Sequence, residues 1–388
     1  MVRRTEHPRR RRRRPTPHQP LKSSKTPRMP RLRAGADAKL KKVFAGIGTP
    51  EPAAFTPDPY QIEAVAAIKS SDCLVTAPTG AGKTWIALQA IAHQLQNNGS
   101  AWYASPLKAL SNAKYAEFSE IFGADQVGIL TGDRKENPEA PVIVGTTEIL
   151  RNHLYDAMHL GRSLRTDLVI LDEAHFLGDP ERGVVWEEIM IYLPARIPLL
   201  LLSATIGNAY RIADWLAGIR GRKCAVVAET RRPVPLYPLF FHPSGTLLPF
   251  VAPTDAVGKP KLYRKVKEYL TARRQPRISL PGRLPPFGEM LSVLKKYNLL
   301  PAIFFLKSRA DCDRALDLCR DYTPQNGDRR GRLAHRIREL VAGSPHIARH
   351  RQRWHLEHPA VGSHHSGQLP AWKLVLESLM TEGLLDAV

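Results

Sequence analysis

Cysteine, acidic residues and long apolar runs are all scarce in this sequence of 388 residues. The four cysteines form no Cys-x-x-Cys pair, and no group of histidines has metal-ligand spacing, which argues against a disulfide framework and a zinc site. No stretch approaches the roughly 18 consecutive apolar residues of a membrane span, and the start lacks the apolar core of a secretory signal. We therefore expect a soluble cytoplasmic protein with no membrane partner.

The shortage of acidic residues leaves an excess of positive charge. Lys and Arg number 57 against 36 Asp and Glu, which gives a formal net charge of +21. Such a charge attracts polyanions such as nucleic acid. Residues 1–42 hold 16 Lys or Arg, 2 acidic residues and few large apolar side chains, so we expect a disordered basic arm that binds phosphates without sequence specificity. A solvated tail with no binding role is the alternative.

The following residues alternate between apolar runs and helical patterns. We expect buried strands at residues 73–77, 101–104, 142–145, 168–171 and 199–202. Patterns with three- and four-residue spacing predict helices between them, at residues 84–94, 110–122 and 147–155. Repeated strand, helix and strand predict an α/β fold with a doubly wound parallel sheet, covered by helices on both faces. Ligands are then expected at the carboxyl ends of the strands.

The rest of the chain has a different composition. Residues 237–298 are rich in proline and contain a basic amphipathic stretch, and we interpret them as a connector with an inserted helix. A second α/β unit is expected at residues 299–388. It would begin with a strand at 302–306, continue through helices at 311–318, 329–341 and 370–380, and reach another strand at 384. A parallel sheet that lacks its later strands has unpaired edges. We therefore expect either that the natural chain continues or that residues 299–388 are loosely ordered.

Residues 77–84, with the sequence APTGAGKT, have the setting of a phosphate-binding loop between a strand and a helix. Gly80 and Gly82 allow the backbone to curl so that N–H groups face inward. Lys83 is expected to bind the terminal phosphates of a nucleotide and Thr84 to ligate magnesium. The nucleotide-binding residues predicted for this loop are Thr79, Gly80, Ala81, Gly82, Lys83 and Thr84. A glycine-rich turn with an exposed lysine is the alternative.

An acidic pair follows a second apolar run, in the sequence LVILDEAH at residues 168–175. Asp172 is placed to hold the magnesium, and Glu173 to orient and deprotonate the attacking water. An acidic pair after a strand is common by chance. Together with the phosphate-binding loop, it favours a site that hydrolyses ATP over a solvated loop.

These two segments resemble motifs I and II of the superfamily 2 DEAD/DEAH-box helicases. Further segments resemble other motifs of that family in the expected order: FTPDPYQ at 55–61 (the adenine-reading Q motif), SPLKAL at 105–110 (motif Ia), TGD at 131–133 and TTE at 146–148 (motifs Ib and Ic), and SAT at 203–205 (motif III). The resemblance implies RecA-like domains of the P-loop NTPase class, with ATP and Mg²⁺ as cofactors. It implies a first RecA-like, ATP-binding domain at residues 43–236 and an incomplete second one at 299–388.

The same resemblance implies roles for single residues. Phe55 and Gln61 would bind the adenine of ATP. The residues facing the nucleic-acid backbone would be Pro106, Lys108, Gly132, Thr147, Arg151, Ser308 and Arg309. Those coupling hydrolysis to domain movement would be His175, Ser203, Ala204 and Thr205. Taken singly, short polar residues such as Thr147 and Ser308 are more often helix caps or turn residues.

Several segments resemble the Ski-like branch of RNA-remodelling helicases in particular. They are RGVVWEE at 182–188, RPVPL at 232–236 and HHSGQLP at 364–370, while FLKSR at 305–309 resembles motif IV. Motifs V and VI of the family have no counterpart in this sequence. Because motif VI supplies arginines that reach ATP, and an arginine finger contributes about 10³ to 10⁵ in rate in related systems, we expect this polypeptide to bind ATP but hydrolyse it poorly.

The leading hypothesis is an ATP-dependent helicase that moves along or unwinds RNA, with DNA less favoured. Its expected partner is a single-stranded or partly duplex nucleic acid. The alternative is a truncated ATP- and nucleic-acid-binding fragment with little hydrolysis or unwinding. A phosphate-loop kinase or transporter ATPase is a third hypothesis, but the SAT segment and the order of motifs argue against it.

Overall fold

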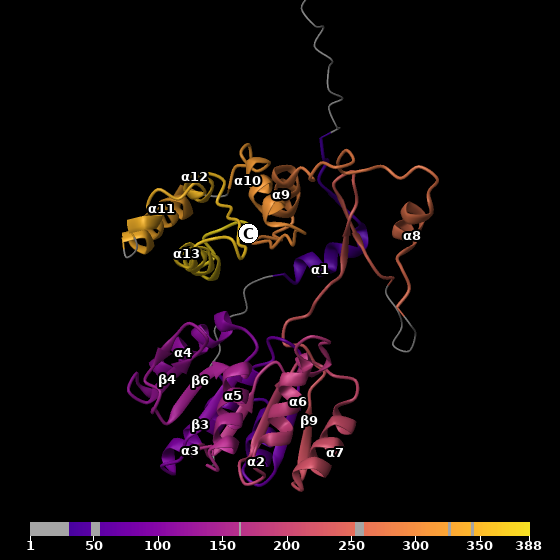
Figure 1. Cartoon of the computed structure of the whole chain (residues 1–388). Coiled ribbons are helices and arrows are strands. Elements are labelled where there is room, and N and C mark those ends of the chain that lie inside the picture. Colours follow the sequence, from indigo (N-terminus) through magenta and orange to yellow (C-terminus); the bar gives the residue numbers. More distant parts are fainter. Residues whose placement is uncertain (1–30, 48–54, 163, 253–259, 325–326, 343–344) are drawn as a thin grey trace, which may run out of the picture. The chain divides into compact units, whose positions relative to one another are not determined.

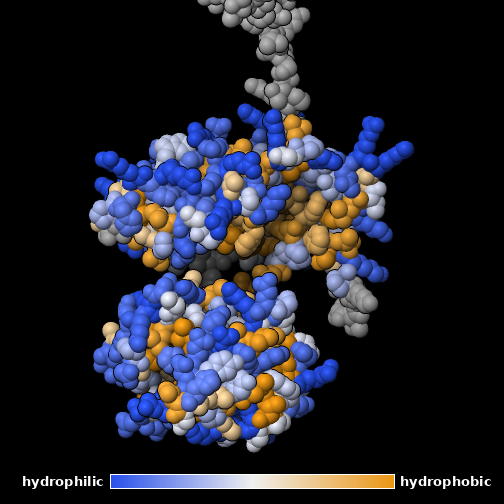
Figure 2. Space-filling view, viewed as in Figure 1, coloured by the Kyte–Doolittle hydropathy of each residue, from blue (hydrophilic) through white to orange (hydrophobic). Residues whose placement is uncertain are grey.

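The computed structural model describes residues 31–47, 55–162, 164–252, 260–324, 327–342 and 345–388. The chain divides into two compact units, one of residues Glu51–Leu236 and one of Met1–Pro50 with Tyr237–Val388 (Figure 1). On the visible face of both units, hydrophobic side chains are interspersed among hydrophilic ones (Figure 2). Within the described ranges, no helix is both long and apolar enough to cross a membrane. The cytoplasmic location stays a prediction.

The unit of residues 51–236 is built on a sheet whose described part has the strand order β5-β4-β6-β3-β7-β8-β2-β9. Its strands are β2 (Asp72–Thr76), β3 (Ala101–Ser105), β4 (Val127–Leu130), β5 (Lys135–Glu136), β6 (Val142–Thr146), β7 (Leu168–Leu171), β8 (Leu199–Ser203) and β9 (Cys224–Ala228). All neighbours pair in parallel except β5, which is antiparallel to β4. The predicted α/β fold with a parallel sheet is confirmed.

Helices cover both faces of this sheet because successive strand residues point to opposite faces. In β2, Cys73 and Val75 join one apolar core, whereas Leu74 joins the other. The first core contains residues of α2 (Pro59–Ile68), α3 (Lys83–Gln96) and α4 (Lys108–Phe122). The second contains residues of α5 (Thr147–His159), α6 (Gly183–Tyr192) and α7 (Ala209–Arg220). The sheet is therefore doubly wound, with a buried layer on each side.

The register of the strands decides which loops share an edge. Thr76 of β2 is paired with Ser203 of β8, and Leu171 of β7 is paired with Leu201 of β8. Because these three strands run in parallel, the loops that follow β2, β8 and β7 all leave the same edge of the sheet. The phosphate-loop segment and the acidic pair are thus neighbours, separated only by β8.

The other unit contains a small sheet in the order β1-β11-β10, formed by Gly35–Ala36, Thr246–Pro249 and Leu239–Phe241. The prediction of a disordered arm is wrong for residues 31–42, which form β1, a 3₁₀ turn and the start of α1 (Lys41–Ala45). Leu40 is buried against Leu247 and Val293. These few apolar side chains suffice to order the segment, because a partner sheet is available to cover them. Residues 1–30 lie outside the described residues.

The predicted connector at 237–298 contains more structure than one helix. Besides β10 and β11, it holds α8 (Arg264–Thr271) and α9 (Phe287–Lys296). The predicted first domain, 43–236, also differs from the observed unit, because residues 43–47 belong to the unit of Tyr237–Val388. Phe44 of this stretch packs with Leu40, and its ring lies 5.2 Å from that of Tyr297.

Helices dominate the remainder of this unit: α10 (Arg309–Asp317), α11 (Gly327–Ala342), α12 (Arg353–Glu357) and α13 (Pro370–Thr381). The prediction of a regular strand at 302–306 is wrong. In this region the described residues form only isolated parallel bridges, from Ala302 to Ala387 and from Val361 to Ala387. Three backbone hydrogen bonds among the described residues join residues 302–304 to residues 386–388. The N–H groups of Ala302 and Phe304 donate to the carbonyl oxygens of Asp386 and Val388, each at 2.9 Å, and the N–H of Val388 donates to the carbonyl oxygen of Ala302 at 3.1 Å. An incomplete second RecA-like domain at 299–388 stays a prediction.

Candidate nucleotide and nucleic-acid site

The loop between β2 and α3 is shaped by two glycines. Gly80 and Gly82 have φ angles of 83° and 82°, a backbone conformation that residues other than glycine rarely adopt. A Cβ on Gly80 would meet no atom within 4 Å, so the backbone angle alone requires glycine there. A Cβ on Gly82 would also lie 2.6 Å from Nε2 of Gln61. Gly82 is the N-cap of α3, which places this curled backbone at the positive end of a helix dipole.

Lys83 begins α3 and turns back over the loop. Its Nζ donates hydrogen bonds to the carbonyl oxygens of Ala77, at 2.8 Å, and Pro78, at 3.2 Å. Burial lowers the pKa of Lys83, while the nearby carboxylates of Glu173 and Asp172 oppose this shift. The ammonium group therefore lies within the electrostatic reach of the acidic pair and is bonded to the loop that follows β2.

The acidic pair at the end of β7 is held in a defined geometry. The backbone N–H of Asp172 donates to the carbonyl oxygen of Ala104 on the neighbouring β3, at 2.9 Å. Oδ1 of Asp172 accepts from the N–H of Glu173 at 2.9 Å, and Oδ2 accepts from the hydroxyl of Tyr103 at 2.5 Å. Glu173 adopts a left-handed φ of 54°, and its Oε2 lies 3.2 Å from Nδ1 of His175. Backbone and side-chain contacts thus fix both carboxylates.

Thr84 and Asp172 supply the oxygen ligands expected for magnesium. Oγ1 of Thr84 already accepts a hydrogen bond from a cation, the ammonium of Lys114, at 3.0 Å, and Lys114 also pairs with Glu117 at 2.8 Å. No group of three or more His, Cys, Asp and Glu in the described ranges could hold a metal ion alone. One hydroxyl and one carboxylate suit Mg²⁺, which typically combines one or two protein ligands with substrate phosphates. The residues therefore fit a metal bound together with a nucleotide.

The residues expected to bind adenine differ in exposure. Gln61 is only 1% exposed, and its Nε2 donates to the carbonyl oxygen of Gly82 at 2.9 Å. Phe55 is 65% exposed, with its ring 5.8 Å from that of Trp85 on α3. The hydroxyl of Tyr60 also donates to a loop carbonyl, that of Ala81. The first turn of α2 is therefore bonded directly to the phosphate loop.

The SAT segment lies between the loop and the acidic pair. The carbonyl oxygen of Ser203 accepts from the N–H of Ala77 at 3.1 Å. Oγ of Ser203 is buried and has no hydrogen-bond partner within the part of the chain that the structure describes. Ala204 is partly exposed and Thr205 is exposed as the chain leaves β8. This position, next to the phosphate loop, suits a segment expected to couple hydrolysis to domain movement.

The residues expected to face nucleic acid follow β3, β4 and β6, on the other half of the same edge. Lys108 and Gly132 come together, since Nζ of Lys108 lies 3.4 Å from the place of a Cβ on Gly132 and 3.0 Å from Oδ1 of Asp133. Arg151 is partly exposed and lies 3.4 Å from Oε2 of Glu188. Thr147 is fully buried, so its side chain is not at the surface.

Pro106 and the two residues of the other unit complete the predicted set. The carbonyl oxygen of Pro106 accepts from Arg182 at 3.2 Å. Ser308 caps α10, because its Oγ accepts from the N–H of Asp311 at 3.1 Å. Arg309 is exposed next to it. The structure thus gives Ser308 the cap role weighed as its alternative, and no observation assigns it a ligand.

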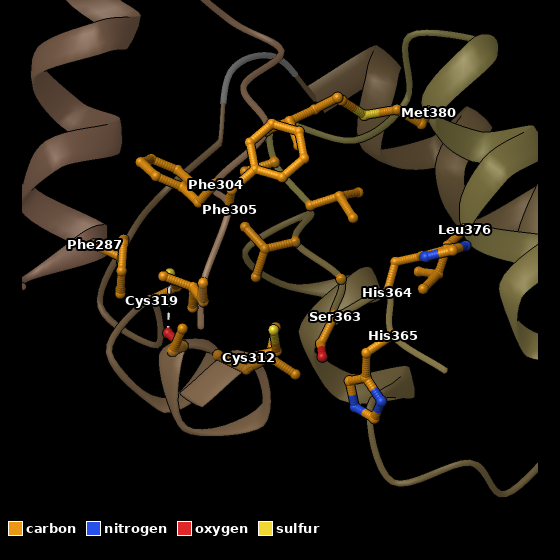
Figure 3. A pocket seen from close by; sticks show the side chains of 18 of the residues that line it. Phe287, Phe304, Phe305, Cys312, Cys319, Ser363, His364, His365, Leu376 and Met380 are labelled. Carbon is orange, nitrogen blue, oxygen red and sulfur yellow. Dashed lines mark hydrogen bonds between the residues drawn. The ribbon is translucent and has the colours of Figure 1, made fainter. Parts of the chain in front are cut away.

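The His-His-Ser-Gly element borders a cavity of about 610 Å³ in the unit that contains α10 and α13. Figure 3 shows His364 beside this cavity, with Phe304 and Phe305 across it. His365 instead bonds to Oδ1 of Asp313 on α10 at 3.2 Å. Asp313 also accepts hydrogen bonds from Ser363 and Gln368, at 3.2 and 3.3 Å. One carboxylate therefore organises the element.

Three residues that contact the candidate site were not predicted from the sequence to be site residues: Tyr103, Lys114 and Arg182. Each contacts a predicted site residue, as described above for Asp172, Thr84 and Pro106. The position of Tyr103 could have been noticed in the sequence, because a tyrosine in an otherwise apolar buried strand needs a hydrogen-bond partner for its hydroxyl. Lys114 and Arg182 lie on patterns that equally suit solvated helix positions.

Comparison with known proteins matches this chain to helicases. Residues 58–212 match the family model described as DEAD/DEAH box helicase. The chain is 33% identical over 376 residues to the DExH-box ATP-dependent RNA helicase DExH15, chloroplastic, of Arabidopsis thaliana and 36% identical over 364 residues to the probable helicase HelY of Mycobacterium tuberculosis. It is 34% identical over 365 residues to Superkiller complex protein 2 of Homo sapiens.

These relatives are much longer than the chain. The alignments cover 86%, 86% and 87% of this chain but 32%, 39% and 29% of the three proteins, respectively. The chain thus spans about a third of the length of the curated relatives that it matches.

Proposed function

This chain belongs to the DEAD/DEAH box helicases through residues 58–212, and on that premise we propose that it couples ATP hydrolysis to movement along, or unwinding of, RNA. The resemblance predicted from the sequence, including that to the Ski-like branch, is confirmed by the relatives. RNA is favoured over DNA because one of them is named an RNA helicase. The observation that carries the proposal is the common sheet edge at which β2, β8 and β7 end.

The chemistry follows from the side chains at that edge. Lys83 would hold the terminal phosphates of ATP, and Thr84 with Asp172 would hold Mg²⁺, whose charge would offset that of the phosphates. Glu173 would accept the proton of the attacking water as general base. His175, 3.2 Å from the Glu173 carboxylate, limits how that carboxylate can turn. Phe55 and Gln61 would contact the base.

Nucleic acid would lie along the other half of the edge. Lys108 is 53% exposed at its side chain, and its partner Asp133 is 69% exposed, so phosphate can replace that carboxylate at little cost. Pro106 and Gly132 lie on the loops after β3 and β4, and Arg151 lies in the second turn of α5, which follows β6. Contacts of this kind position one strand without reading its sequence.

The proposal is tested by the effect of RNA on ATP turnover. We expect single-stranded RNA to raise the rate, and a partly duplex RNA to be separated only when ATP is present. The alternative, an ATP- and nucleic-acid-binding fragment, is kept because the chain spans about a third of its relatives. ATP and RNA binding without stimulated turnover would favour that alternative and contradict the helicase proposal.

The basic segment before residue 31 gives a separate prediction about RNA binding. Residues 1–30 hold 11 Lys or Arg and 1 Glu. Because cationic side chains release counterions from phosphates, deleting residues 1–30 should weaken RNA binding. It should also flatten the salt dependence, by about 0.7 in slope for each phosphate that the shortened chain no longer neutralises. The deletion stops before residue 31 because Leu40 belongs to a folded core.

A gentler variant keeps the chain length constant. Changing the six arginines at residues 9–14 to serine should produce part of the same change in slope, measured by RNA titrations at several salt concentrations. Equal slopes for this variant, the deletion and the full chain would leave the basic segment without a role in binding.

A further inference from the structure

A tyrosine beneath the acidic pair has no role in the function proposed above. Tyr103 lies on β3, and its hydroxyl donates a hydrogen bond to Oδ2 of Asp172. We propose that Tyr103 is a positioning residue for ATP hydrolysis, which holds the Asp172 carboxylate in the orientation that receives Mg²⁺. This inference rests on the proposed function, because that function gives Asp172 its metal.

The register of β3 and β7 explains how the two side chains meet. Tyr103 is paired with Ile170, and both belong to the same buried core. Asp172 follows Ile170 by two positions, and residues two apart along extended backbone point to the same face. The long side chain of Tyr103 reaches from its own row to this next position. The bond therefore joins the strand that leads to Pro106 with the strand that ends in the acidic pair.

The hydrogen bonds of Asp172 restrain it from several directions. Its backbone N–H is bonded to Ala104, its Oδ1 to the N–H of Glu173 and its Oδ2 to Tyr103. Two of these three partners are on β3. A carboxylate has about four lone-pair sites, so two such bonds leave acceptor capacity for a metal or its water. Without Tyr103, Oδ2 would have no restraint from the protein among the described residues.

Tyr103 is suited to a fixed donor role. Its side chain is fully buried, and its ring meets that of Phe118 edge to face at 5.1 Å. Burial and the adjacent Asp172 carboxylate raise the pKa of Tyr103 well above its usual range, so the hydroxyl keeps its proton. Groups that hydrogen-bond metal ligands orient them, and their loss typically lowers metal affinity or activity about 10- to 100-fold.

The test is Tyr103→Phe, which keeps the ring and its packing but removes the hydroxyl. The affinity of a fluorescent, non-hydrolysable ATP analogue is measured with Mg²⁺ and again with EDTA. The ratio of the two affinities reports the metal's contribution and does not depend on turnover. We expect this ratio to fall about 10-fold in Tyr103→Phe, with the affinity in EDTA unchanged.

Tyr115→Phe is the matched control. Tyr115 lies on α4 of the same unit, and its hydroxyl also bonds to a carboxylate, Oε2 of Glu136 at 3.3 Å, away from the acidic pair. The ratio should equal that of the unaltered chain in this variant. Thermal unfolding of both variants shows whether the loss of a hydroxyl has changed the stability of the unit. Binding is then compared at a temperature below the unfolding transitions of both variants.

Each outcome bears on a different claim. An unchanged ratio in Tyr103→Phe would overturn the positioning role. So would equal losses of affinity with Mg²⁺ and with EDTA, because they would indicate damage to the whole site. If the unaltered chain itself binds the analogue equally well in both conditions, the metal site of the proposed function fails instead.

Discussion

Lys83→Ala is expected to lower ATP turnover by at least about 100-fold, the effect of removing one charged donor from a preorganised phosphate site. Among the described residues the ammonium donates to two carbonyl oxygens, those of Ala77 and Pro78, and to no carboxylate, so it is available to a phosphate. Its pKa is lowered by burial, which means that the charge is partly desolvated and gains from a phosphate partner. Nucleotide binding should weaken as well, as measured by titration.

The control for this variant is Lys69→Ala, an exposed lysine directly after α2. It removes the same charge from the same unit without touching the loop, so turnover should not change. Unfolding curves for both variants should coincide. Undiminished ATP affinity and turnover in Lys83→Ala would remove the loop after β2 from the proposed site.

Glu173→Gln is expected to keep nucleotide binding and to lower the single-turnover rate of hydrolysis by about 10² to 10⁴, the usual contribution of a general base. Glutamine preserves the size of the side chain and can still bond to His175, but its amide cannot accept a proton from water. Glutamine and glutamate have the same substituents at Cα and Cβ, so we expect the left-handed φ of 54° at residue 173 to be kept. The effect should therefore be confined to chemistry.

Glu181→Gln supplies the comparison, because Glu181 is an exposed acid after the same strand. Its single-turnover rate should match that of the unaltered chain. A normal rate in Glu173→Gln would assign the role of base to another group. A loss of nucleotide affinity in that variant would instead place Glu173 in the binding site rather than in the proton transfer.

Much of the first unit could be predicted from runs of apolar residues. The run at 168–171 coincides with β7, and the other four predicted strands differ from those observed by one residue at most at either end. These central strands are buried on both faces, so their sequences are continuously apolar. The strands that were missed lie toward the edges. Most residues of β9 are partly exposed, and β4 is only four residues long with a glycine inside.

The phosphate loop and the acidic pair could be predicted to lie together, because each motif includes the carboxyl end of the strand that precedes it. A loop after a strand and an acid after another strand must share an edge once the sheet is parallel. Side-chain partners such as Tyr103 for Asp172 and Lys114 for Thr84 depend on which strands and helices are neighbours, and the order along the chain does not specify this. The roles of the individual residues stay predictions, since no ligand contact tests them.

The second unit was harder to predict, and residues 31–42 show why. Their composition is basic and poor in large apolar side chains, which is typical of disorder. What orders them is the sheet strand Thr246–Pro249, about 200 residues later, with which Gly35 and Ala36 pair in parallel. Local composition carries no information about a partner so distant in sequence.

The amide of Gln61 is engaged at both ends before any ligand arrives. Nε2 donates to the carbonyl oxygen of Gly82 at 2.9 Å, and Oε1 accepts from the N–H of Asp58 at 2.7 Å. A purine that binds this amide must therefore replace existing hydrogen bonds, each worth about 0.5–1.5 kcal/mol. The free energy gained by binding the purine is thus the difference between the new hydrogen bonds and the similar ones that they replace. One of the bonds exchanged braces Gly82. Discrimination among bases and rigidity of the phosphate loop are thus thermodynamically linked through a single side chain.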